Sequence, residues 1–90
     1  MSNRRPLQIK KLILATIKDG KPHTFAELER RINTNWQTVR DHCRELDVFN
    51  CVRIEKRQSH KINNRPYYEI TITKNGRLVL EKLESSDHLK

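Results

Sequence analysis

The chain has 90 residues, of which 33% are charged and 34% hydrophobic, and its formal net charge is +8 at pH 7. Ninety residues suit one domain with a small core, and the periodic clusters of apolar residues argue against a disordered chain. The positive charge is concentrated in residues 1–22 and 51–66, with six basic residues against one acidic residue and five against one. A basic domain with this uneven distribution indicates a polyanionic partner.

Several functional classes have no support in the sequence. No apolar run approaches the ~20 residues that span a bilayer, and no signal-peptide core follows Met1. We therefore expect no membrane partner and a cytoplasmic location, nucleoid-associated if the source is a prokaryote or a virus. The absence of a Gly-rich phosphate loop, an H-E-x-x-H motif and a nucleophile turn argues against an enzyme. We also expect no cofactor and find no sign of a small-molecule ligand.

The N-terminal segment predicts a flexible arm followed by a helix. Residues 1–6 form a basic arm in which Arg4 and Arg5 could enter a DNA groove, although a disordered terminus explains the same residues. The spacing then predicts a helix over Leu7–Asp19, closed by Gly20 as its C-cap. At 100° per residue its core face should consist of Ile9, Leu12, Ile13, Thr16 and Ile17.

Three leucines fall outside the expected core faces. Leu7 and Leu14 lie nearly opposite the apolar stripe of the first helix, among lysines, and Leu78 is left over in the last helix. They are candidate contacts of a homodimer, and scattered surface leucines are the alternative. We expect a homodimer because a second copy would add buried surface to a small core.

The centre of the chain, Phe25–Leu46, predicts two short helices joined by a tight turn. Thr24 and Glu27 make a capping box, which marks the start of a helix ending near Ile32. The Asn-Thr-Asn that follows can end this helix in the left-handed conformation and cap a second helix, Trp36–Leu46. So short a connection forces a steep crossing, which is the helix-turn-helix arrangement. The apolar residues at helical spacing are Leu28, Ile32, Val39, Cys43 and Leu46.

The second of these helices turns polar residues outward. An α-helix fits the DNA major groove, where Gln pairs with adenine edges, Arg with guanine and a Thr methyl group with thymine. Trp36 could stack on nucleic acid or anchor the core. Asp41 would pair with Arg40 or Arg44, or accept from a cytosine amino group. The candidate DNA-binding residues on helix 35–46 are Asn35, Trp36, Gln37, Thr38, Arg40 and Arg44.

Residues 52–72 predict a β-hairpin. Val52 and Ile54 alternate with charged residues, and Pro66–Ile72 also alternates, so two antiparallel strands are expected. Lys21–Thr24 is long enough for one further stub of strand. Positive side chains repel one another unless a polyanion draws them together, so this hairpin indicates phosphate or minor-groove contact. Its candidate DNA-binding residues are Arg53, Lys56, Arg57, His60, Lys61, Asn63, Asn64 and Arg65.

The end of the chain predicts a helix over Lys74–Glu84 and a frayed tail over 85–90. Thr73 should cap this helix, and the Thr-x-x-Gly that it begins is similar to the final helix entry of many winged-helix regulators. Asn50 stands where that family usually has Gly, at the turn into the first strand of the hairpin.

The order of elements over residues 7–84 resembles the winged helix-turn-helix DNA-binding family, and most of all small single-domain regulators of archaea and their viruses. The resemblance implies an α+β fold: a three-helix core, a two-stranded antiparallel wing hairpin and a C-terminal helix. Glu29 stands where many members keep a small residue, which implies a looser helix crossing.

The two cysteines stand where the family has buried Leu. In a reducing cytosol Cys43 and Cys51 would be small hydrophobic residues, and a disulfide or redox switch is the alternative. His42 and His60 could be joined with them as metal ligands, but the chain has no C-x-x-C pair, and we expect no metal site.

The residues and the resemblance together predict a sequence-specific binder of double-stranded DNA, a homodimeric transcriptional regulator. Helix 35–46 would enter the major groove and hairpin 52–72 would lie as a wing over the flanking backbone. The alternatives are a winged-helix protein–protein interaction module and a non-specific architectural DNA- or RNA-binding protein. A protein–protein module would need no basic wing.

Overall fold

The computed structural model describes residues 6–58 and 67–88, which form four helices and three strands. Seven of the candidate site residues lie outside the described residues: Arg4, Arg5, His60, Lys61, Asn63, Asn64 and Arg65. The elements are α1 (Pro6–Thr16), β1 (His23–Thr24), α2 (Phe25–Ile32), α3 (Trp36–Val48), β2 (Val52–Arg57), β3 (Tyr67–Ile72) and α4 (Lys74–His88).

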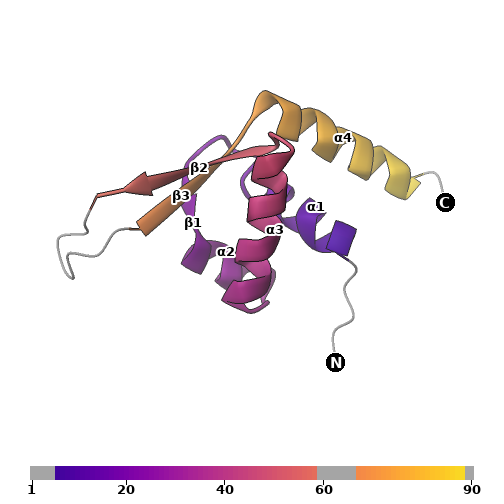
Figure 1. Ribbon diagram of the computed structural model, residues 1–90. Helices are drawn as coiled ribbons and strands as arrows, with labels where there is room; N and C mark the ends of the chain where they lie inside the picture. Colours follow the sequence, from indigo (N-terminus) through magenta and orange to yellow (C-terminus); the bar gives the residue numbers. More distant parts are fainter. Residues whose placement is uncertain (1–5, 59–66, 89–90) are drawn as a thin grey trace.

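The three strands form one antiparallel sheet in the order β1-β3-β2. The hairpin register runs from Val52 opposite Ile72 to Arg57 opposite Tyr67, and β1 adds to the other edge of β3. Both the antiparallel hairpin and the stub of strand before α2 are therefore confirmed. The β2–β3 hairpin extends to one side of the helices and α4 to the other, with α3 between them (Figure 1).

The core lies where α1, α2 and α3 meet the sheet. The last helix, α4, packs on α1 and adds Leu80 to the core. Leu14 is fully buried, with 0% of its surface exposed, so its prediction as a dimer contact was wrong. The reason is that α1 contacts α2, α3 and α4, and a helix packed on several sides buries more than one stripe. Leu12, expected in the core face, is only partly buried.

Three helix ends differ from the sequence-based boundaries. α1 ends at Thr16, before the expected Asp19, and the chain then turns through Gly20 at φ 82°. α3 continues to Val48 and α4 to His88, past the expected ends at Leu46 and Glu84. Helix ends depend on capping and tertiary contacts that a periodicity does not define.

The turn between α2 and α3 follows from two asparagine residues. Asn33 adopts the left-handed conformation at φ 61°, and its N–H donates to the carbonyl of Glu29, which ends α2. The side-chain oxygen of Asn35 accepts the N–H of Thr38 at 2.9 Å and caps α3. The capping and the left-handed Asn predicted from the sequence are confirmed.

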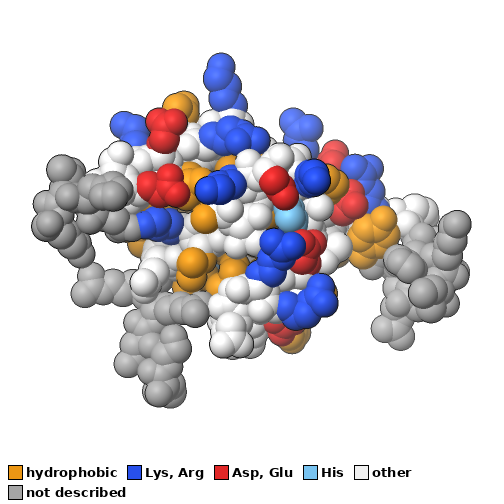
Figure 2. Space-filling view, turned by 180° about the vertical axis from the view of Figure 1, so that it is seen from behind, with side chains coloured by type: hydrophobic (Ala, Val, Ile, Leu, Met, Phe, Trp, Pro, Cys, Tyr) orange, Lys and Arg blue, Asp and Glu red, His pale blue; other side chains and the backbone are white. Residues whose placement is uncertain are grey.

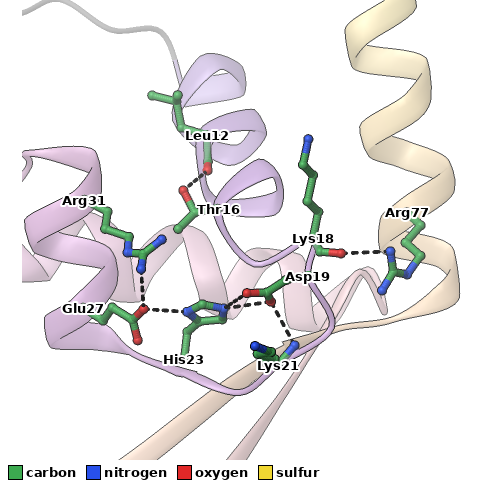
Figure 3. Close-up of polar contacts among 9 residues, drawn as sticks. All are labelled: Leu12, Thr16, Lys18, Asp19, Lys21, His23, Glu27, Arg31 and Arg77. Carbon is green, nitrogen blue, oxygen red and sulfur yellow. Dashed lines mark hydrogen bonds and ion pairs between the residues drawn. The ribbon is translucent and has the colours of Figure 1, made fainter.

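A buried histidine ties this unit to the turn after α1. His23 is only 5% exposed, and its two ring nitrogens lie 2.8 Å from a Glu27 carboxylate oxygen and 3.0 Å from an Asp19 carboxylate oxygen (Figure 3). Burial would lower the pKa of His23, but the hydrogen bonds to the two carboxylates outweigh it and raise the pKa. Glu27 also pairs with Arg31 at 3.4 Å. The N-terminal half of the predicted capping box is present, since Thr24 accepts the N–H of Glu27.

The entry into α4 is held close to the end of α3. The Thr73 hydroxyl donates to the carbonyl of Asn50 at 2.6 Å and accepts the N–H of Gly76, so Thr73 caps α4 as predicted. Asn50 itself has φ 61°, as expected for a residue that replaces Gly. The Thr73 N–H donates to the carbonyl of Cys51 at 3.1 Å.

Candidate nucleic-acid interface

The orientation of α3 is fixed from two directions. Its buried face, Val39, Cys43 and Leu46, lies in the core. On one flank the ammonium group of Lys10 in α1 donates to Nδ1 of His42 at 2.8 Å and pairs with Glu45. His42 is mostly buried, and burial together with the Lys10 charge lowers its pKa.

The predicted residues of α3 lie together on its remaining surface. Trp36, Gln37 and Arg44 are exposed, and Thr38 and Arg40 are partly buried. Asn35 is also exposed, but its side-chain oxygen is already used as the cap of the helix. The surface therefore offers an amide, a hydroxyl and two guanidinium groups, which are hydrogen-bonding groups suited to base edges.

Trp36 does not anchor the core, since 50% of its surface is exposed. The guanidinium carbon of Arg40, one turn further along α3, lies 5.2 Å from the centroid of the Trp36 ring. It also lies 5.8 Å from the ring centroid of Phe25, the first residue of α2. Phe25 and Tyr68 of β3, two aromatic residues not predicted as part of the site, connect this flank to the hairpin, with their ring centroids 6.0 Å apart.

Asp41 has a partner that the sequence analysis did not name. Its carboxylate accepts from the side-chain amide of Gln37 at 3.2 and 3.4 Å, one turn earlier on α3. This i,i+4 spacing is a recognised helix pair that sequence reasoning could have found. Gln37 keeps its amide oxygen and one N–H for an external partner.

The basic side chains of β2 lie on different faces of the sheet. The register places Lys56 opposite Tyr68, on the same sheet face as the core residue Ile70 and the partly buried Ile54. Arg53 and Arg57 therefore occupy the other face.

The guanidinium of Arg57 is engaged within the hairpin. It donates to the carboxylates of Glu69 at 2.7 Å and Glu55 at 3.1 Å, which raises the pKa of Arg57. Its charge is thus balanced by two carboxylates, although Arg57 is exposed, as Arg53 and Lys56 are.

Other surfaces have a different character. On the face seen from behind, basic and acidic side chains lie interspersed (Figure 2). Leu7 and Leu78 are 59% and 51% exposed. Near Leu7 an open apolar hollow of about 620 Å³ lies between α1, the end of α3 and α4, lined by Pro6, Leu7, Lys10, Leu46, Phe49, Cys51, Asn75 and Val79.

The cysteines are free and buried, and burial raises the pKa of Cys43 to about 12. Within residues 6–58 and 67–88, no three His, Cys, Asp or Glu residues are grouped to hold a metal ion. No helix in the described part of the chain is both long and apolar enough to cross a membrane.

A helix-turn-helix followed by an antiparallel hairpin and a last helix defines the winged helix-turn-helix fold, as the sequence predicted. No protein-family model and no curated protein matches the sequence. Solved structures match the fold. A transcriptional regulator homologue from Pyrococcus horikoshii OT3 has a TM-score of 0.75 and 18% identity, and the match covers 97% of this chain and 85% of that chain.

Two more structures are similar. The smu.1704 protein from Streptococcus mutans UA159 has a TM-score of 0.79 and 18% identity, with 94% of this chain and 80% of that chain covered. The transcriptional regulator BldR from Sulfolobus solfataricus has a TM-score of 0.67 and 20% identity, with 82% of this chain but only 50% of BldR covered. The similar structures thus come from archaea and from bacteria.

Proposed function

We propose that this protein is a sequence-specific double-stranded DNA-binding transcriptional regulator. In this proposal α3 enters the major groove and the β2–β3 hairpin lies as a wing over the flanking phosphate backbone. If the source is a prokaryote or a virus, such a protein would act in the cytoplasm in association with the nucleoid. The observation that carries the proposal is the surface of α3, where Gln37, Thr38, Arg40 and Arg44 are gathered on a helix held firmly by α1 and α2.

The division of labour follows from side-chain chemistry. Bidentate groups such as Gln and Arg distinguish base edges, so Gln37, Arg40 and Arg44 are assigned to base reading. Single cations on exposed strands attract phosphates without regard to sequence, so Arg53 and Lys56 are assigned to the backbone. Arg57 contributes less, because Glu55 and Glu69 already balance its charge.

The test is selection from a random pool of duplex DNA at two salt concentrations, followed by sequencing of the bound fraction. We expect an enriched site whose affinity falls steeply with salt. Lys56→Ala should weaken binding to every sequence alike and reduce the salt slope by about one unit. Gln37→Ala should relax the preference at one position of the site. Lys82→Ala, an exposed lysine on α4, is the matched control and should change neither quantity.

Other outcomes would point elsewhere. Salt-sensitive binding without an enriched sequence would mean that the protein is a non-specific architectural DNA- or RNA-binding protein and not a sequence-specific regulator. A lack of duplex binding even at low salt, together with a salt-insensitive protein partner, would favour a protein–protein interaction module. A uniform loss of affinity from both Lys56→Ala and Gln37→Ala would contradict the assignment of base and phosphate contacts.

A homodimer is part of the proposal. Exposed apolar side chains at the start of α1 and on α4, Leu7 and Leu78, are suited to contact with a second copy, and Phe49 at the hollow between these helices is 67% exposed. A two-fold dimer would require a palindromic DNA site. Analytical ultracentrifugation should show a dimer that Leu7→Lys and Leu78→Lys weaken. A monomer at micromolar concentration, bound to a non-palindromic site, would remove this part of the proposal.

A further inference from the structure

The wing-side flank of α3, defined here by Trp36 and Arg40, carries a guanidinium group between two aromatic rings. Arg40 lies 5.2 Å from the centroid of the Trp36 ring and 5.8 Å from that of Phe25. The Phe25 ring is in turn 6.0 Å from the ring of Tyr68, at an interplanar angle of 51°. Arg40 is therefore held at the place where α3, the start of α2 and the wing strand β3 come together.

This arrangement leaves the hydrogen-bonding edge of Arg40 available. Aromatic rings attract the flat face of a guanidinium group, whereas its N–H donors lie in the plane of the group. Among the described residues, the Arg40 side chain makes these ring contacts and no hydrogen bond to protein. Arg31, Arg57 and Arg77 differ, because each of them binds a carboxylate or a carbonyl oxygen within the described fold.

Holding Arg40 in advance matters because a free arginine side chain loses much rotamer freedom when it binds. Contacts that already restrict the side chain reduce this loss at the moment of binding. A guanidinium with a fixed plane also presents its two parallel N–H donors in one direction, which is what the O6 and N7 acceptors of guanine require. The ring contacts thus favour one base over the others, rather than adding affinity for any sequence.

We infer that Trp36 and Phe25 are positioning residues for Arg40, and that Arg40 sets a guanine preference at the base pair between α3 and the wing. The inference rests on the proposed function, since it assumes that this surface meets duplex DNA. It adds a specific division of roles on the flank: Arg40 contacts the base, while the two rings act through Arg40.

The experiment compares the base preferences of variants of the full chain, selected from the same random duplex pool. Arg40→Lys keeps the positive charge but lacks the planar, parallel pair of donors, so it should strongly reduce the guanine preference at one position. Trp36→Leu should reduce discrimination at that same position by about 3-fold, the size expected for one ring contact, and leave other positions unchanged. Trp36→Phe should restore most of it. Lys82→Ala, at an exposed position of α4 away from this flank, is the control and should have no effect.

A double variant separates positioning from direct contact. If Trp36 acts only through Arg40, adding Trp36→Leu to Arg40→Lys should change the preference at that position no further. Loss of affinity for all sequences from Trp36→Leu, or a change at a different position, would mean that Trp36 contacts the DNA itself and would overturn the inference. The base preferences of Phe25→Leu are measured by selection from the same duplex pool. Because Phe25 is partly buried, urea unfolding of this variant is used to confirm that it folds.

The failure of the inference and of the proposed function can be told apart. Wild-type protein that selects no sequence would overturn the proposed function and the base-reading role of Arg40 together. Wild-type protein with a guanine preference that Arg40→Lys reduces, but that is unchanged in both Trp36→Leu and Phe25→Leu, would overturn only the positioning role of the rings.

Discussion

Replacing Gly76 by Ala should destabilise the protein, although the same change in an ordinary helix interior stabilises by about 1 kcal/mol. A Cβ atom at Gly76 would lie 2.0 Å from the carbonyl oxygen of Cys51 and 2.9 Å from Cγ1 of Ile72. Ordinary contact begins at 3.4 Å, so α4 would have to move away from Cys51 by about 1.4 Å.

That movement affects more than one contact. It pulls on the bond from the Thr73 N–H to the Cys51 carbonyl and on the bond from the Thr73 hydroxyl to the Asn50 carbonyl. Overpacking costs about 1–3 kcal/mol and each weakened hydrogen bond about 1 kcal/mol, against the gain in helix propensity. The expected net loss is about 2–4 kcal/mol, a large share of the stability of a small domain.

Urea unfolding followed by circular dichroism measures this change, with the m-value as a check that the denatured state is unaltered. Lys82→Ala, at an exposed position of the same helix, should remain within about 0.5 kcal/mol of the wild type. A Gly76→Ala variant as stable as the wild type, or more stable, would refute the close packing of α4 on the end of α3.

Three further outcomes are expected. Leu14→Ala should cost about 3 kcal/mol in urea unfolding because Leu14 is fully buried, whereas Val48→Ala, at a position that is 79% exposed, should cost less than about 0.5 kcal/mol. Asn35→Ala removes the cap of α3 and should lower stability by about 1 kcal/mol, and an unchanged melting temperature would mean that the cap contributes nothing. His23→Gln should be most destabilising in acid. Since the carboxylate partners raise the pKa of His23, their stabilisation is complete below the ordinary value of 6.5 and is lost as the pH rises through the higher folded-state pKa.

The pH profile of His23→Gln is best taken as a difference from the wild type. The contribution of His42 to stability has the opposite pH dependence. Because the fold lowers the pKa of His42, the unfolded chain binds the proton more readily, and stability falls as the pH falls. His42 is present in both proteins, so its contribution cancels. A deficit of the variant that stays constant between about pH 5 and pH 9 would show that His23 is not ionised in the fold.

Much of the fold could be predicted because local side-chain chemistry and tertiary structure agree. Thr24, Asn33 and Asn35 each have one strong local preference, and each adopts it. The alternation of the two wing strands gives their register, since a shift by one residue would turn Ile54 and Ile70 away from the core.

The burial of Leu14 could not be predicted from the pattern of its own helix. It depends on tertiary packing, because α1 contacts α2, α3 and α4, and α4 lies near the other end of the chain. A single-stripe model of an amphipathic helix assumes one buried face, and α1 has neighbours on more than one side.

The candidate site was predictable as a set of residues but not as a set of contacts. Residue type and exposure on α3 select Gln37 and Arg40, and charge selects Arg57. The partners that modify them come from cross-strand and cross-helix neighbours: Glu69 beside Arg57, and the ring of Phe25 beside Arg40. Such pairs require the register and the helix crossing to be known first.

The buried thiol of Cys43 allows the opening of the helix-turn-helix to be followed without an introduced label. Thiol reagents attack the thiolate, and Cys43 is fully buried with a pKa near 12. Modification must therefore wait for molecules in which α3 has separated from the core, so its rate follows that local opening. Cys51, at the rim of the apolar hollow, lies beside α4 instead. The ratio of the two rates tells whether α4 separates from the core before α3 or together with it.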